Sequence, residues 1–298
     1  MSVNISDRQK QSFAQDGFLI TEQLIDETTI AVLTDRYARL FDGEFETGVC
    51  PDEVNWQSNR SDPTLTRQIC NGWKADRQIA RVVLSQELGR AIAQLAGWEG
   101  ARLIQDNVIW KPPGARALGF HQDNAYVAWY TPREMLSCWI ALDDTSADSG
   151  TLEVVRGSHR WPTCNEPIGA FHAPDDYRAS MQHVARRLKT EPDVVPVAVP
   201  RGGGVFHHGW TWHGSGPNLS QRDRRALVLH GGSAKSRFVV ENLNQGNGPI
   251  YGRYRRLGDD QMDEQHFPVL WTHTGYRTPG IEAYLYDTPA HDTSNFNS

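Results

Sequence analysis

The chain is poor in the features of secreted and membrane-bound proteins. Its 298 residues include only four cysteines, Cys50, Cys70, Cys138 and Cys164, and these form no Cys-x-x-Cys pair. Reduced side chains without a disulfide or a structural metal are therefore expected. No apolar run approaches the roughly 18 residues that span a bilayer, and the first residues lack the basic and apolar regions of a signal peptide. The sequence thus predicts a cytoplasmic protein without a membrane partner.

Positive charge is scarce as well. Lys and Arg number 30 against 36 Asp and Glu, so the formal net charge is -6 at pH 7. The Arg-rich stretches around Arg186 and Arg224 are too short to form a nucleic-acid surface, and no nucleic-acid partner is expected. The ten tryptophans fit an aromatic-lined cavity as well as a core. These features leave the oligomeric state open.

The first hundred residues carry mainly helical signals. Ser6 and Gln9 have the spacing of a capping box, and Asp26 is placed to cap a second helix. Residues 18–20, between these two helices, are expected to form a strand. An apolar stripe at helical spacing predicts a third helix over residues 76–96. Residues 43–61 are polar and contain glycine and proline, which predicts a connecting loop that either borders a pocket or is simply solvated.

From residue 102 the pattern changes to short apolar runs separated by turn residues, which is typical of strands. Helices followed by strands indicate an α+β fold in which the helices back an antiparallel sheet. Residues 175–189 have one apolar helical face, which suits either a lid or a surface helix packed outside the strands. The predicted strands are residues 103–110, 136–142, 151–155, 194–199, 205–208 and 225–230.

No internal repeat or linker divides the chain, so a single domain over residues 1–298 is predicted. Residues 1–100 form its mainly helical support, and residues 101–235 form its strand-rich core. An insertion interrupts this core at about residues 161–192. Residues 236–298 keep many aromatic side chains and are expected to cover the core.

A candidate metal site begins at His121 and Asp123. On an extended strand, residues two apart point to one face. This imidazole and this carboxylate can therefore bind the same metal ion. A further histidine would complete the two-histidine, one-carboxylate set that holds non-haem Fe(II). His207, His208 and His213 compete for that role. Without such a set of ligands, a single histidine like His121 most often has a structural role.

Several motifs occur in a fixed order along the chain, at residues 16–19, 121–123, 138–144, 150–159 and 213–218, followed by Arg224. Together they resemble the phytanoyl-CoA dioxygenase family of Fe(II)/2-oxoglutarate oxygenases. The resemblance implies a double-stranded β-helix, the cupin-like jelly roll, backed by the N-terminal helices. It also implies that the metal ligands are His121, Asp123 and His213.

The same resemblance implies that Fe(II), 2-oxoglutarate as cosubstrate, and O2 take part. Arg224, eleven positions after the distal histidine, matches the arginine that binds the far carboxylate, for which a planar guanidinium is suited. Ser215 resembles a hydroxyl partner of that carboxylate, and Trp139 resembles a pocket wall, although it suits the core equally well. Strand periodicity places Gln105 and Asn107 on one face of the strand. Either one of them contacts 2-oxoglutarate or substrate, or the nearby backbone supplies the hydrogen bonds of these buried amides.

The activity that the resemblance implies is hydroxylation of a C-H bond in a small organic metabolite, with release of succinate and CO2. Asp123 disfavours halogenation, because related halogenases have a small residue at this position. Desaturation, epoxidation and rearrangement stay open. Two alternatives are a cupin-type metal hydrolase or isomerase, since the ligand set also suits zinc, and a catalytically silent binding protein of the same fold.

Aromatic residues next to the metal motifs predict an aromatic substrate pocket with a few polar groups. The lack of a basic patch for phosphates weighs against an acyl-CoA substrate. The residues expected near this pocket are Asn124, Tyr126, Trp129, Tyr130, Trp210 and Trp212.

Overall fold

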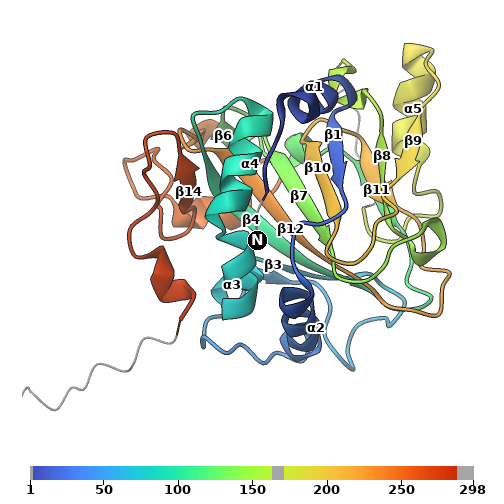
Figure 1. The fold of residues 1–298 in the computed structure, drawn as a ribbon, viewed down its shortest axis with the longest axis horizontal. Helices are drawn as coiled ribbons and strands as arrows, with labels where there is room; N and C mark the ends of the chain where they lie inside the picture. The colour runs from blue at the N-terminus through green and yellow to red at the C-terminus, as the bar shows by residue number, and fades with distance from the viewer. Residues whose placement is uncertain (1–2, 163–170, 287–298) are drawn as a thin grey trace, which may run out of the picture.

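A computed structural model describes residues 3–162 and 171–286 of the chain. Two β-sheets face each other, and helices cover the outer face of the larger one (Figure 1). The larger sheet has the order β1-β10-β7-β12-β4-β3-β2, with β14 also paired to β4. Its strands are β1 (Phe18–Thr21), β2 (Glu53–Val54), β3 (Arg67–Cys70), β4 (Gly100–Lys111), β7 (Leu136–Ala141), β10 (Gly204–His208), β12 (Arg224–Ser233) and β14 (Val269–Thr272).

The smaller sheet has the order β5-β11-β8-β9, and all of its pairings are antiparallel. Its strands are β5 (Leu118–His121), β8 (Leu152–Val155), β9 (Val194–Pro196) and β11 (His213–Ser215). A separate two-stranded sheet pairs β6 (Tyr130–Thr131) with β13 (Arg237–Phe238). Two facing antiparallel sheets around a common interior form the predicted jelly roll.

Alternation along each strand divides the apolar residues between two cores. On β7, Cys138 and Ile140 point outward and pack with the helices, whereas Trp139 and Ala141 point into the space between the sheets. On the outer face lie α2 (Glu27–Phe41), α3 (Arg77–Val83) and α4 (Gln86–Ala96), and α1 (Asp7–Asp16) precedes β1. The interior between the sheets is thereby left for a cavity at one end of the barrel.

The helix-capping predictions are confirmed. The hydroxyl of Ser6 accepts the amide of Gln9, whose side chain in turn accepts the amide of Ser6. Asp26 caps α2 by accepting the amide of Thr29. The predicted third helix is wrong in one respect, because it divides at Leu84 into α3 and α4. The physical reason is Ser85, whose hydroxyl accepts the amide of Leu88 and starts a new helix.

Strand β1 confirms the strand predicted at residues 18–20 and forms one edge of the larger sheet. The N-terminal region also contains β2 and β3, which were not predicted and which extend the other edge beyond β4. Strand β2 lies within residues 43–61, which the sequence predicts to be a loop. The sequence Arg67-Gln68-Ile69-Cys70 lacks an apolar alternation because its inward face borders a polar cavity, so the usual strand signal is missing.

Helix α5 (Ala179–Leu188) confirms the helix predicted within the insertion. Its Met181 and Val184 pack with Phe120 and Trp212. This helix is therefore packed against the outside of the smaller sheet, as the surface alternative proposes. Part of the predicted insertion, residues 163–170, lies outside the described residues.

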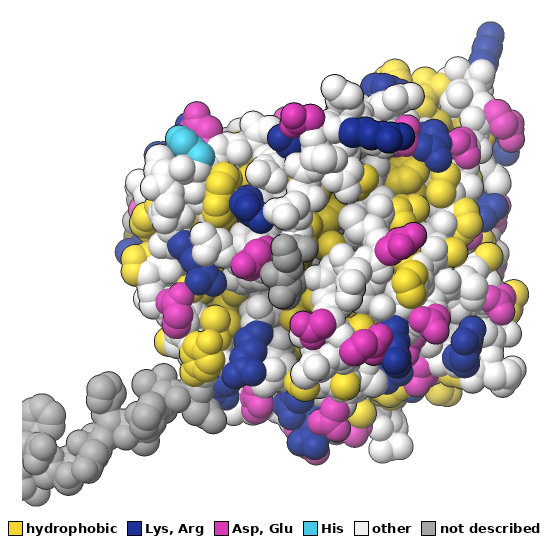
Figure 2. Space-filling model, viewed as in Figure 1, with side chains coloured by type: hydrophobic (Ala, Val, Ile, Leu, Met, Phe, Trp, Pro, Cys, Tyr) yellow, Lys and Arg dark blue, Asp and Glu magenta, His cyan; other side chains and the backbone are white. Residues whose placement is uncertain are grey.

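The region after β13 packs against residues of the β6 side of the barrel. Tyr251 stacks on Trp129 with ring centroids 5.3 Å apart, and Phe267 completes this cluster. Cys50, Cys70 and Cys138 are free thiols, while Cys164 lies outside the described part of the chain. None of the described helices has the length and apolar character required to cross a membrane. On the face drawn in Figure 2, acidic and basic side chains are interspersed.

Candidate metal and cosubstrate site

His121, Asp123 and His213 come together at the end of the smaller sheet. His121 ends β5 and is the register partner of His213, which begins β11. One ligand atom from each of the three residues lies within 4.8 Å of the other two. The Nε2 atoms of His121 and His213 are 3.6 Å and 3.4 Å from Oδ1 of Asp123. The arrangement has the donor set of a facial two-histidine, one-carboxylate metal site.

Local backbone contacts orient both imidazoles. Nδ1 of His121 is 2.9 Å from the carbonyl oxygen of Gly119, and Nδ1 of His213 is 2.9 Å from the carbonyl oxygen of Thr211. A carbonyl only accepts, so each Nδ1 carries the proton and donates it. Each Nε2 then has a free lone pair directed at the common centre. A hydrogen bond of this kind from a ligating histidine is usual in metal sites, and the residues fit a divalent metal.

The electrostatic surroundings favour the metal-binding forms of Asp123 and His121, whereas Asp123 outweighs the effect of burial and raises the pKa of His213. Burial would raise the pKa of the Asp123 carboxyl, but His213 and His230 nearby hold that pKa well below its usual value. Burial lowers the pKa of His121, with a further contribution from His213. A carboxylate and a neutral imidazole are the ligand forms that bind a metal.

The second oxygen of Asp123 has partners that sequence reasoning missed. Oδ2 accepts the hydroxyl proton of Ser137 at 2.7 Å, and Oγ of Ser137 is 2.7 Å from Nδ1 of His230. Nε2 of His230 is 2.9 Å from Nδ2 of Asn107. A signal was available, because Arg224 and His230 are separated by an even number of positions on one strand and so share its inner face.

Arg224 lies at the cavity end of β12 and is only 2% exposed. Its Nε and Nη2 donate to the carbonyl oxygen of Gly150 at 3.1 Å and 2.8 Å, and no carboxylate of the described residues forms an ion pair with it. Burial lowers its pKa to about 10, which leaves it a cation at neutral pH. The guanidinium carbon is 5.9 Å from the ring centroid of Trp139. Ser215, from β11, lines the same cavity.

Lys111, which the sequence analysis did not single out, is the register partner of Arg224 and is fully buried. Its ammonium donates to the carbonyl oxygens of Ser215, at 3.2 Å, and of Gly216. Burial and the nearby Arg224 cation hold its pKa well below the usual value. Both effects disfavour the charged form of Lys111, so it is Arg224 that supplies positive charge for an anionic ligand at this end of the barrel.

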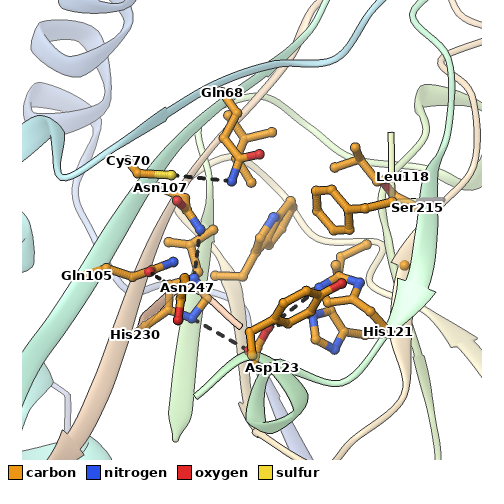
Figure 3. A pocket seen from close by; sticks show the side chains of 18 of the residues that line it. Gln68, Cys70, Gln105, Asn107, Leu118, His121, Asp123, Ser215, His230 and Asn247 are labelled. Carbon is orange, nitrogen blue, oxygen red and sulfur yellow. Dashed lines mark hydrogen bonds and ion pairs between the residues drawn. The ribbon is translucent and has the colours of Figure 1, made fainter. Parts of the chain in front are cut away.

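Gln105 and Asn107 both line the cavity from β4, as strand periodicity predicts (Figure 3). Oε1 of Gln105 accepts the hydroxyl of Tyr251 at 2.6 Å and Nδ2 of Asn247 at 3.2 Å. Because its oxygen already has two donors, the amide nitrogen of Gln105 is the group left for a ligand. The side chains are thus satisfied in part by other side chains rather than by nearby backbone.

The competing histidines separate clearly. His207 lines the cavity, but its Nδ1 is 3.8 Å from Oδ2 of Asp123, on the side away from the metal-facing Oδ1. His208 accepts the amide of Trp210 through Nδ1 at 3.1 Å and does not line the cavity. The metal-type cluster formed by the described residues includes His213 and neither of these two.

The predicted aromatic pocket is largely wrong in its membership. Tyr126 lines the cavity, but Trp129 and Tyr130 are buried in the core beneath the C-terminal region. Asn124 is also buried elsewhere, where it accepts the amide of Met135. Trp212 packs against α5, and Trp210 stacks under Arg133. The reason is strand alternation and the turn after β5, which direct these rings away from the metal cluster.

The cavity has a volume of about 320 Å³ and joins the metal cluster to Arg224. Its aromatic walls are Trp139, Tyr126 and Phe171, whose ring is 4.8 Å from that of His121. Sequence reasoning also missed a polar wall, which comes from β2 and β3 and the residue after β2. This wall consists of Glu53, Asn55, Gln68 and Cys70.

A jelly roll with this ligand set and a buried arginine across the cavity defines the class of non-haem iron, 2-oxoglutarate-dependent dioxygenases. The family model described as phytanoyl-CoA dioxygenase matches residues 13–226, and the chain belongs to this family. As a member of this class it uses Fe(II), 2-oxoglutarate and O2. The class assignment sets aside the hydrolase and silent-binding alternatives.

Proteins that resemble this chain in sequence or in fold carry names that describe different activities. The chain is 27% identical over 256 residues to a probable alpha-ketoglutarate-dependent hypophosphite dioxygenase from Stutzerimonas stutzeri, covering 84% of each chain. It is 24% identical to the peroxisomal phytanoyl-CoA dioxygenase of Bos taurus, covering 82% of this chain and 73% of that one. The solved structure of the carbocyclase SnoK from nogalamycin biosynthesis has a TM-score of 0.68 at 20% identity, covering 89% of this chain and 96% of that chain.

Proposed function

We propose that the protein hydroxylates a C-H bond of a small organic metabolite, with Fe(II) bound by His121, Asp123 and His213. The observation that carries this proposal is the convergence of two Nε2 atoms and one carboxylate oxygen, with both Nδ1 atoms held by backbone carbonyls. Iron bound with 2-oxoglutarate and O2 supplies the oxidising chemistry, and succinate and CO2 are released. Asp123 fills the position that a halide would need, which supports hydroxylation over halogenation.

In this proposal Arg224 binds the far carboxylate of 2-oxoglutarate through its guanidinium. The group is buried and has only a carbonyl partner among the described residues, so a carboxylate would complete its hydrogen bonding. Ser215 donates its hydroxyl to the same carboxylate, and Trp139 forms the wall beside it. The amide nitrogen of Gln105 and the side chain of Asn107 border the cosubstrate and the substrate.

The cavity residues also keep the reaction space dry. Phe171, Leu118 and Ile109 line it with apolar surface, and the metal ligands themselves are largely buried. Exclusion of water strengthens the interaction of the Arg224 cation with an anion. It also protects a reactive centre from unwanted side reactions.

The test has two parts. Anaerobic addition of Fe(II) and 2-oxoglutarate to the purified chain should produce the weak visible charge-transfer band of this coordination, and Asp123→Ala should abolish it. Metabolite extracts should then be screened for fractions that stimulate succinate release, and the product of an active fraction should have gained one oxygen atom by mass spectrometry. A band that persists in both His121→Ala and Asp123→Ala would contradict the ligand assignment. A desaturated or cyclised product would contradict hydroxylation while leaving the metal site intact.

A further inference from the structure

The polar wall opposite the metal ligands is a cross-strand row of side chains. Glu53 on β2 is the register partner of Cys70 on β3, which is the register partner of Asn107 on β4. Register partners in an antiparallel sheet project to the same face, and all three residues line the cavity. In Figure 3 the side chains of Cys70 and Asn107 lie across the cavity from His121. The row therefore faces whatever is bound beside the metal.

A chain of hydrogen bonds connects the Asn107 amide to Asp123 and leaves the amide oxygen of Asn107 without a partner among the described residues. Ser137 donates its only hydroxyl proton to Asp123, so it must accept from Nδ1 of His230. Nε2 of His230 is 2.9 Å from Nδ2 of Asn107, an amide nitrogen that only donates, so Nε2 accepts this hydrogen bond. The amide oxygen Oδ1 of Asn107 is then left over. It is buried and has no hydrogen-bond partner among the residues that the structure describes.

This unpaired oxygen identifies the kind of group that the wall requires. Asn107 is only 7% exposed, so an acceptor without a partner there is costly, by about 1 to 3 kcal/mol. A carboxylate or keto oxygen of 2-oxoglutarate is itself an acceptor and does not satisfy it. A hydrogen-bond donor on the substrate does.

Glu53 adds to this row an acidic group that has no direct ion-pair partner among the described residues. Its neighbour Asp52 is paired with Lys74 at 2.8 Å and with Arg253 at 2.8 Å. No ion pair of Glu53 occurs within residues 3–162 and 171–286, and burial raises the pKa of its carboxyl. Lys74 and Arg253 pair directly with Asp52, and Arg253 acts on Glu53 only from a distance. Of these two acidic residues, Glu53 alone lines the cavity.

We infer that the substrate carries a basic nitrogen, as an ammonium or guanidinium group, that binds Glu53 and donates a hydrogen bond to Oδ1 of Asn107. This inference rests on the proposed function, since it concerns the substrate of the same cavity. The two charged sites then divide the ligands between them. Arg224 attracts the anionic cosubstrate, and Glu53 attracts the cationic end of the substrate. The apolar walls formed by Phe171 and Ile250 accommodate the carbon skeleton between them.

The experiment uses the full chain loaded anaerobically with Fe(II) and 2-oxoglutarate. The probes are alkylamines and alkylguanidines of three to six carbons, each matched by the alcohol or urea of the same length. Binding is measured by titration calorimetry and by the change in the visible charge-transfer band. We expect the cationic member of at least one pair to bind about 10-fold or more tightly than its neutral match. Glu53→Gln should abolish this preference, and Glu53→Asp should retain part of it.

Glu44→Gln is the matched control, because Glu44 is exposed and lies outside the cavity lining, and it should keep the preference. Equal binding of cationic and neutral probes, binding of neither, or a preference that persists in Glu53→Gln would each overturn the inference. The visible charge-transfer band distinguishes a failure of this inference from a failure of the proposed function. If the wild-type chain gives no band, the proposed function fails. If the band forms and the cation preference is missing, only the inference about the substrate fails.

Discussion

The cavity has two polar walls that are built in different ways. On the metal wall, each histidine is oriented by a carbonyl two residues before it in the chain, Gly119 for His121 and Thr211 for His213. On the opposite wall, Glu53 reaches the cavity only because β2 pairs with β3 and β3 pairs with β4. Short-range contacts thus orient the proposed metal ligands, whereas strand pairing positions the groups proposed to bind substrate. The two walls should accordingly respond differently to substitution.

The largest effect is expected at the metal wall. Asp123→Ala removes the carboxylate of the proposed ligand set and should lower substrate-stimulated succinate release by at least about three orders of magnitude. It should also remove the charge-transfer band. Asp35→Ala, on the exposed face of α2, is the control and should behave like the wild type. Retention of more than a tenth of the activity by Asp123→Ala would show that this carboxylate is not a ligand.

The next effect concerns the cationic end of the cavity. Arg224→Met removes the proposed carboxylate partner and should raise the KM for 2-oxoglutarate about 10- to 100-fold, the value of a charged hydrogen-bonded contact. Arg225→Met is a matched control, because Arg225 pairs with Asp143 and does not line the cavity. Initial rates over a range of 2-oxoglutarate concentrations give the KM of each variant. Equal KM values for both variants would contradict the proposed role of Arg224.

A smaller effect is expected where the two walls connect. Ser137→Ala deletes the hydroxyl that joins Asp123 to His230, and loss of such a partner typically weakens metal binding about 10-fold or somewhat more. Titration with Fe(II) under anaerobic conditions measures this change directly. If the affinity of Ser137→Ala for Fe(II) equals that of the wild type, the orientation of Asp123 does not depend on this contact.

The smallest effect is expected at the base of the substrate wall and concerns stability. Burial alone would raise the pKa of Asp52, but Lys74 and hydrogen bonds from Tyr254 and Asn71 lower it overall. A lowered folded-state pKa stabilises the protein above the unfolded pKa of about 3.9 and loses this contribution as the pH falls through the folded value. Asp52→Asn should therefore cost about 1 to 2 kcal/mol at pH 7.

Urea unfolding at pH 7 and at progressively lower pH checks this prediction. The difference in unfolding free energy between wild type and Asp52→Asn should shrink as the pH falls below about 4. The metal wall should be unaffected, so the charge-transfer band at pH 7 should remain. Two curves that stay parallel over the whole range would show that the Asp52 carboxylate does not provide pH-dependent stability.

Several features of the molecule could be predicted from the sequence without knowledge of the fold. The capping box at Ser6 and the cap at Asp26 are local, since each involves residues three apart. The ordered motifs around His121, His213 and Arg224 placed the chain in its family. By contrast, Trp129 and Tyr130 follow the metal motif in sequence yet belong to another core. Their direction depends on the turn after β5 and on packing with Tyr251, which no local pattern reveals.

The sequence by itself determined the chemistry available, namely two imidazoles and a carboxylate for a metal and a guanidinium for an anion, because these residue types stand in a recognisable order. Only the tertiary structure decided which further groups meet that chemistry. Glu53, Cys70 and Asn107 become neighbours through the register of three strands, and Ser137 and His230 meet through the pairing of two more. Cross-strand register depends on long-range packing and hydrogen bonding, and so it leaves no signature in any one stretch of the chain.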